Sequence, residues 1–159
     1  MGQKIKRILT FLIIKLIRIF GFKIPPISTV SGIIEKDGKI LMINLSYQKG
    51  LALPGGGIEE GETCQEALKR EIKEETGLQI TKITPLGNYT SKKDVYSTLH
   101  FCFLVTTKNS NIVESAEGKP VWIKTKKALR QCVYKDEQEA IKDFLKQKMS
   151  SQKALSGTN

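Results

Sequence analysis

The chain is poor in the residues that build disulfide frameworks and Cys/His metal sites. Its 159 residues include three cysteines and one histidine. Cys64, Cys102 and Cys132 are odd in number and widely spaced, so neither a disulfide framework nor a zinc-binding pattern is visible. This cysteine usage fits a reducing compartment, and we expect a cytoplasmic protein. His100 lies among apolar residues, which is more typical of a sheet residue than of a catalyst.

Acidic residues are missing from the first 34 positions, although the whole chain contains 16. This stretch contributes +6 to a net charge of +10 through Lys4, Lys6, Arg7, Lys15, Arg18 and Lys23. Within it, residues 3–20 combine a basic stripe with a broad apolar face, which predicts an amphipathic helix. Such a helix can lie peripherally on an anionic membrane or pack on the domain or a second subunit, and both alternatives stay open. A membrane span or a secretory signal is disfavoured, because Lys15 and Arg18 interrupt the apolar run.

The chain is long enough for one domain with a substantial core and too short for two. We expect the basic helix and a linker at 1–24, a globular domain at 25–148 and a flexible tail at 149–159. Periodicity and turn residues predict strands at 28–35, 39–45, 51–53, 79–89, 95–107 and 121–123, and helices at 64–76, 125–130 and 135–148. This order predicts an α/β fold with a mixed β-sheet between helices.

The most distinctive stretch is residues 56–78, GGIEEGETCQEALKREIKEETGL, which contains seven glutamates. Thr63 and Glu66 have the Ser/Thr-x-x-Glu spacing of a capping box, so a helix is expected to begin near Thr63. Gly77 is the residue type that commonly ends a helix. Just upstream, the run 55–57 consists of glycines and predicts a loop whose backbone can approach a ligand closely.

Three glutamates share one face of this predicted helix. Glu71, Glu74 and Glu75 follow i, i+3, i+4 spacing, so their carboxylates are expected to converge. Like charges at this spacing repel, and a hard divalent cation relieves the repulsion because it takes carboxylate oxygens as ligands. A merely solvated Glu/Lys-rich helix is disfavoured by the adjoining glycine run and by the fixed spacing. We therefore expect a Mg²⁺ site that can also take Mn²⁺.

The spacing of these residues resembles the Nudix box, G-x5-E-x7-R-E-U-x-E-E-x-G-U, in which U is a bulky aliphatic residue. All nine specified positions match, from Gly56 to Leu78. The resemblance extends more loosely over residues 27–148. It implies a Nudix-like α/β/α sandwich and a MutT-like enzyme. Such an enzyme uses a metal-activated water to hydrolyse a pyrophosphate bond in a nucleoside diphosphate derivative or nucleoside triphosphate.

The resemblance also implies roles for individual residues. Arg70 would orient one of the glutamates through a bidentate pair, and Glu62 would support the loop–helix geometry. Glu117 lies where related enzymes often carry an additional glutamate, as a metal ligand or general base. The metal ligands would be Glu71, Glu74, Glu75 and the carbonyl of Gly56. Apart from the resemblance, the freedom of glycine leads us to expect that Gly55, Gly56 and Gly57 place backbone carbonyls or N–H groups at the metal and the phosphates.

The sequence narrows the substrate only to a nucleotide-type small molecule. Tyr96 occupies the interval where diadenosine polyphosphate hydrolases carry a base-stacking tyrosine, but a sheet-surface position is favoured. The proline of many ADP-ribose pyrophosphatases is replaced by Lys93 and Asp94. A catalytically silent nucleotide-sensing module and an RNA 5′-pyrophosphate hydrolase stay open as rivals. A nucleic-acid partner is disfavoured, because no aromatic-basic RNA-binding surface is visible. A homodimer also stays open.

Overall fold

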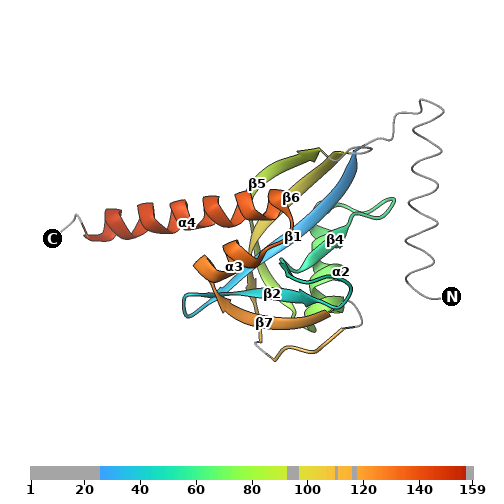
Figure 1. The fold of residues 1–159 in the computed structure, drawn as a ribbon, viewed down its shortest axis with the longest axis horizontal. Coiled ribbons are helices and arrows are strands. Elements are labelled where there is room, and N and C mark those ends of the chain that lie inside the picture. The colour runs from blue at the N-terminus through green and yellow to red at the C-terminus, as the bar shows by residue number, and fades with distance from the viewer. Residues whose placement is uncertain (1–25, 93–96, 110, 116–117, 157–159) are drawn as a thin grey trace.

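The structure, a computed structural model, describes residues 26–92, 97–109, 111–115 and 118–156 (Figure 1). The expected N-terminal helix at 3–20, Tyr96 and Glu117 lie outside the described residues. Membrane contact through residues 3–20 therefore stays a prediction. Within the described ranges, no helix combines the length and the apolar character that crossing a membrane requires.

The element order confirms the expected α/β fold. The elements are β1 (Ile27–Lys36), β2 (Lys39–Leu45), β3 (Leu51–Ala52), β4 (Gly55–Gly57), α2 (Cys64–Thr76), β5 (Ile80–Lys92), β6 (Ser97–Thr107), β7 (Gly118–Lys124), α3 (Thr125–Gln131) and α4 (Lys135–Ser156). The strands join in the order β3-β2-β1-β6-β5, with β4 also paired to β1 and β7 to β2. The sheet is mixed, because β1 and β6 run parallel while the other pairs are antiparallel.

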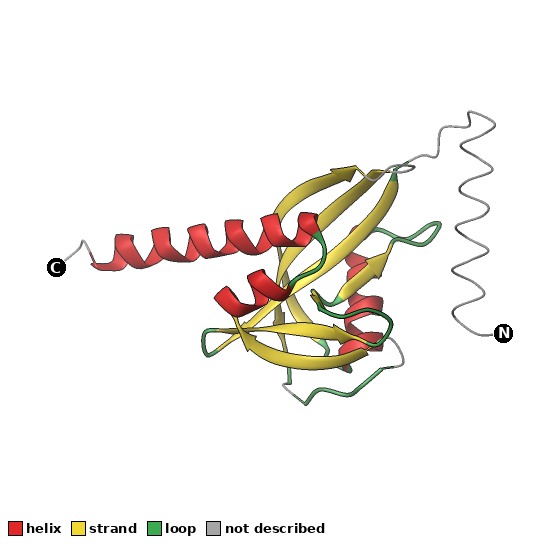
Figure 2. Cartoon of the chain, viewed as in Figure 1, coloured by secondary structure: helices red, strands yellow, loops and turns green. Residues whose placement is uncertain are grey.

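Helices cover the sheet from two sides, with α2 apart from α3 and α4 (Figure 2). Because side chains alternate along a strand, β1 contributes residues to a separate hydrophobic cluster on each face of the sheet. Val30 and Ile34 belong to the cluster that includes Leu68 and Ile72 of α2. Ile33 belongs to the cluster that includes α3 and α4 residues. Burying a large aliphatic side chain contributes about 1.5–3 kcal/mol, so these contacts fix α2 against β1.

Helix α2 has the predicted bounds and the predicted ends. The Glu66 N–H donates to Thr63 Oγ1 at 3.3 Å, and the Thr63 N–H donates to Glu66 Oε2 at 2.9 Å, which completes the capping box. Gly77 adopts a left-handed conformation with φ of 72°, and its N–H bonds to the Lys73 carbonyl. A glycine suits this C-cap because an L side chain is strained there. The register of the glutamates on α2 is therefore fixed locally.

Two expectations require correction. The glycine run 55–57 is the short strand β4 rather than a loop, because its backbone pairs antiparallel with residues 29–31 of β1. The flexible tail expected from residue 149 is wrong through Ser156, because α4 continues to that residue. The extension contains no glycine or proline, and the Ser150 and Ser151 hydroxyls donate to carbonyls four residues earlier. The Ser, Gly and Asn content of residues 150–159 therefore misplaced the end of the helix.

Candidate functional site

Arg70 ties the start of the acidic segment to the helix. Its Nε and Nη2 donate to the two oxygens of Glu62 at 2.7 and 2.8 Å, a bidentate pair. Its Nη1 donates to Glu71 Oε1 at 2.7 Å, and Nη2 also reaches the carbonyl of Gly57 at 3.0 Å. These hydrogen bonds lower the pKa of Glu62 to about 2 and raise the pKa of Arg70. The bidentate partner of Arg70 is thus Glu62, and Glu71 receives a single bond.

Glu71 lies directly against the backbone of Gly56. A Cβ added at Gly56 would come within 2.4 Å of Glu71 Oε1. The Glu71 side chain is only 14% exposed. At Gly57 the same added atom would meet nothing within 4 Å. Glycine at position 56 therefore makes room for a carboxylate, whereas glycine at 57 does not serve that purpose.

Glu75 is the most buried of the three predicted ligands. It is 6% exposed, and its Oε2 accepts a 2.7 Å hydrogen bond from the N–H of Gly55. A second carboxylate, Glu137 at the start of α4, accepts the N–H of Leu53 at 2.8 Å. Between them, the carbonyl of Pro54 accepts the N–H of Gly32 at 2.9 Å. The backbone before β4 is therefore held by carboxylates from two different helices.

Glu74 stands apart from the other two glutamates. Its side chain is 63% exposed and lies 3.6 Å from Arg70 Nη1. In the part of the chain that the structure describes, no three His, Cys, Asp or Glu side chains are grouped closely enough to hold a metal ion as they are placed. The structure thus brings Glu71 and Glu75 to the glycine strand and leaves Glu74 facing solvent, so the expected convergence of all three carboxylates is not seen.

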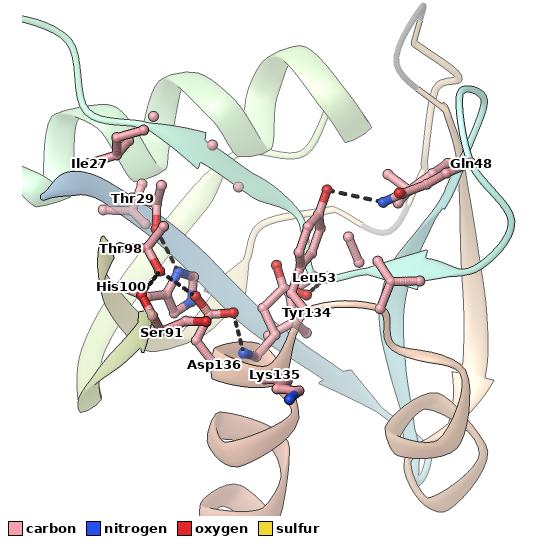
Figure 3. A pocket seen from close by; sticks show the side chains of 18 of the residues that line it. Ile27, Thr29, Gln48, Leu53, Ser91, Thr98, His100, Tyr134, Lys135 and Asp136 are labelled. Carbon is pink, nitrogen blue, oxygen red and sulfur yellow. Dashed lines mark hydrogen bonds between the residues drawn. The ribbon is translucent and has the colours of Figure 1, made fainter. Parts of the chain in front are cut away.

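A cavity of about 680 Å³ opens beside β4 and Glu75 (Figure 3). All three glycines of β4 line it, as do residues from the start of β1 and the segment after β2. The opposite wall is the segment 133–137 that leads into α4. The Tyr134 hydroxyl bonds to the Tyr47 hydroxyl at 3.1 Å and accepts from Gln48 Nε2 at 3.2 Å. This volume lies within the usual range for small-molecule sites.

Two further titratable groups line the cavity. Burial raises the pKa of Glu137 to about 8, although hydrogen bonds from Leu53 and Cys132 oppose the shift. Burial also lowers the pKa of His100, against the opposing charge of Asp136. His100 is 3% exposed on β6, with Nδ1 2.9 Å from Thr29 Oγ1 and Nε2 2.8 Å from Ser31 Oγ. The expectation that His100 is a sheet residue is correct.

Sequence reasoning missed the wall of the cavity that faces β4. Its polar members are Tyr47, Gln48, Tyr134, Lys135, Asp136 and Glu137. In the sequence, residues 134–137 are an ordinary polar start of a helix, the kind of segment that usually faces solvent. The start of α4 reaches the glycine strand because of a tertiary contact, the parallel bridge between Leu51 and Cys132. No local spacing signal announces such a contact.

Known proteins resemble this chain in sequence and in fold. The ADP-ribose pyrophosphatase of Methanocaldococcus jannaschii is 54% identical over 69 residues, which cover 42% of this chain and 41% of that protein. The nucleoside triphosphatase NudI of Escherichia coli O139:H28 is 44% identical over 63 residues, which cover 35% of this chain and 45% of that protein. The matches thus span less than half of each curated relative.

Solved structures extend the similarity over most of the chain. The solution structure of the E. coli ORF135 protein superposes with a TM-score of 0.69 at 23% identity, covering 80% of this chain and 94% of the other. At that identity the likeness establishes the fold. A model of the NUDIX domain family matches residues 25–144. Since that match covers well over half of the sequence, the chain belongs to the NUDIX domain family.

Proposed function

We propose that the chain is a Mg²⁺-dependent hydrolase that cleaves a pyrophosphate bond in a nucleoside diphosphate derivative or nucleoside triphosphate. One observation carries the proposal. The complete box between Gly56 and Leu78 lies on β4 and α2 so that Glu75 and the glycines form a wall of a substrate-sized cavity. The names of the relatives, an ADP-ribose pyrophosphatase and a nucleoside triphosphatase, support the same substrate class.

The residues on α2 suit a hard divalent cation. Glu71, Glu74 and Glu75 offer carboxylate oxygens from successive turns of one helix, and Gly56 leaves the space that the Glu71 carboxylate fills. Oxygen donors of this kind are the preferred ligands of Mg²⁺. When bound, Mg²⁺ neutralises phosphate charge and activates water. We assign Glu71, Glu74, Glu75 and the Gly56 carbonyl as the ligands, and Glu117 as an additional ligand or base.

The other residues of the box act by positioning. Arg70 neutralises Glu62 and holds Glu71 at the glycine strand, so the ligand carboxylate is oriented before substrate arrives. The Gly55 N–H gives Glu75 a fixed orientation. Preorganised charges of this kind lower the barrier of a reaction because little reorganisation is needed when it occurs.

The test is product release with Mg²⁺ or Mn²⁺ across a substrate panel. The panel contains nucleoside triphosphates and their oxidised forms, ADP-ribose, dinucleoside polyphosphates and 5′-triphosphate RNA. We expect one mononucleotide-class compound to be preferred and Glu75→Gln to lose at least about 10²-fold in rate, a typical loss for removing an electrostatic stabiliser. Glu60→Gln is the matched control, because Glu60 is an exposed carboxylate in the turn before α2.

Three outcomes would change the conclusion. Wild-type turnover by folded Glu75→Gln would refute the site assignment. Preference for 5′-triphosphate RNA would replace the small substrate with an RNA end. Tight nucleotide binding that needs no Mg²⁺, without turnover of any compound, would indicate a nucleotide sensor instead.

A further inference from the structure

Three lysines form a row across three neighbouring strands at the end of the β1–β2 hairpin. Asp37 and Gly38 make a two-residue turn with φ of 51° and 73°, the conformation that joins twisted strands closely. The turn places Lys36 opposite Lys39, and the pairing of β2 with β7 places Lys39 opposite Lys124. Directly opposed residues have Cβ atoms about 5 Å apart. The strand register therefore brings three positive charges side by side.

The adjacent acidic residues Glu35 and Asp37 make no ion pair with the row in the part of the chain that the structure describes. All three lysines are exposed, and none makes an ion pair with a carboxylate among the residues that the structure describes. The neighbouring carboxylate of Glu35 already accepts Lys148 Nζ at 2.6 Å and the N–H of Gly38 at 3.0 Å. Like charges placed directly opposite each other destabilise a sheet. An external anion would relieve this repulsion.

A cavity of about 310 Å³ adjoins this row. Lys36 and Lys108 line it, together with Trp122, Asn109 and Glu35, whose carboxylate is paired with Lys148. Trp122 stands two residues before Lys124 on β7, so both side chains project from the same face of the sheet. The cavity thus combines an aromatic wall with cationic groups, and the remaining two lysines extend the positive charge beyond it.

This cavity is separate from the hydrolase site. The parallel pairing of β1 and β6 places Thr29 beside His100 at the first cavity and Ile34 beside Val105 at the second. Five residues of strand separate the two pairs, roughly 17 Å at the usual rise per residue. Among the described residues, none that lines one cavity also lines the other. A ligand at the lysine end therefore does not need the machinery of α2.

We propose that this second site binds a free nucleoside polyphosphate. Its phosphate chain would lie on Lys36, Lys39 and Lys124, and its base would enter the cavity against Trp122. The size favours this ligand, because a cavity near 300 Å³ suits a small molecule. Lysines bind phosphate as point charges, and aromatic faces stack on any base. The binding step involves no hydrolysis and does not rest on the function proposed above.

The sole tryptophan of the chain makes the site directly observable. Trp122 fluorescence would be titrated with ATP in the full-length protein, in EDTA so that divalent metal does not support binding at α2. We expect saturable quenching that weakens at least about tenfold in Lys36→Gln/Lys39→Gln, since each lost phosphate contact removes a charge-assisted bond. Lys49→Gln is the matched control, because Lys49 is an exposed lysine that lines neither cavity.

Titrations with other ligands in the same assay identify the ligand class. Inorganic tripolyphosphate tests the phosphate chain alone, and we expect it to bind more weakly than ATP because it lacks a base. An eight-nucleotide RNA without a 5′-triphosphate tests a nucleic-acid partner, and vesicles with 30% phosphatidylserine test a membrane surface. Unchanged fluorescence up to 5 mM ATP, equal affinity in Lys36→Gln/Lys39→Gln, or tighter binding of RNA, tripolyphosphate or vesicles than of ATP would each overturn the proposal.

Discussion

The two ends of the parallel pair β1 and β6 carry opposite charge, and they differ in whether the charged side chains have partners. At one end, the carboxylates of Glu71, Glu75 and Glu137 are held by backbone N–H groups or by Arg70. At the other, Lys36, Lys39 and Lys124 stand opposite one another without a carboxylate partner among the described residues. The negative end is oriented before any ligand arrives, whereas the positive end is not.

This difference is the one expected between a catalytic site and a surface that attracts anions. Catalysis needs charges whose positions are fixed in advance, because reorganisation raises the barrier. Attraction of an anion needs only a positive field, which flexible exposed lysines provide. The carboxylate end should therefore respond steeply to small changes in shape. The lysine end should respond to changes in charge and ionic strength.

The steepest response is expected at Gly56. In Gly56→Ala the new methyl group would occupy the place of the Glu71 carboxylate, which must then move away from β4. We expect hydrolysis to fall about 10²-fold, because displacing a positioned group by about 1 Å has effects of this size. The fold should persist, since a side-chain end can rotate. Steady-state kinetics and circular dichroism measure the two effects.

Gly57→Ala is the control for this change. The two residues are adjacent in the same strand, but a Cβ at Gly57 meets nothing within 4 Å. Its activity should stay near that of the wild type. Equal losses in both variants would mean that β4 requires glycine for its backbone, and that the contact between Gly56 and Glu71 has no special role.

A smaller loss is expected when Arg70 becomes lysine. Lysine keeps the charge but cannot reproduce the bidentate pair with Glu62 while also donating to Glu71. We expect about a tenfold loss in kcat with little change in KM, less than for removing a stabilising charge outright. Lys69→Arg, one position earlier and exposed, controls for a basic substitution on α2. Wild-type kcat in Arg70→Lys would show that Glu71 needs no guanidinium to hold it.

Local patterns in the sequence predicted the bounds and ends of α2 well. The capping box and Gly77 fixed the bounds of α2, because those interactions close within a few residues. The spacing of the box also identified Arg70 and its glutamates. The partner of Arg70 was not predictable, since Glu62 and Glu71 both lie within its reach and only the folded loop selects the bidentate one.

Contacts between segments distant in the sequence could not be predicted from the sequence. Glu137 meets Leu53 across 84 residues, and no periodicity specifies that hydrogen bond. The lysine row likewise depends on the register between β2 and β7, which pairs Lys39 with Lys124. The glycine run was expected as a loop, because glycine is uncommon inside strands and the pairing with β1 leaves no local signal. Tertiary register, rather than propensity, decided these features.

The pH dependence of stability offers a third test of the carboxylate end. Burial raises the pKa of Glu137 to about 8, so the folded state keeps a proton that the unfolded state releases above its ordinary pKa. The contribution of Glu137 to the free energy of unfolding is therefore fully present below about pH 4.5 and is lost as the pH rises toward 8. Glu137→Gln removes the titration while its amide oxygen can still accept the N–H of Leu53.

We expect the melting temperature of Glu137→Gln to exceed that of the wild type increasingly between pH 5 and pH 8, by on the order of 10 °C. Other charged or titratable groups that act on Glu137 are Cys132, Asp136 and Glu75. All three are retained in the variant, so their effects largely cancel in the difference. If the melting temperatures of the two proteins change with pH in the same way across this range, Glu137 is ionised in the folded state.

The smallest effect is expected at the lysine end. Lys39→Glu places a carboxylate between Lys36 and Lys124, so two repulsive cross-strand pairs become attractive. Exposed pairs of this kind are weak, and we expect a rise in melting temperature of about 1–3 °C at low salt. The rise should vanish near 0.5 M NaCl, because salt screens exposed charges. Lys49→Glu controls for the change in net charge and should leave the melting temperature nearly unchanged. A rise in Lys39→Glu that persists at high salt would point to packing or strand propensity rather than charge, and the contrast between the two ends would then not be electrostatic.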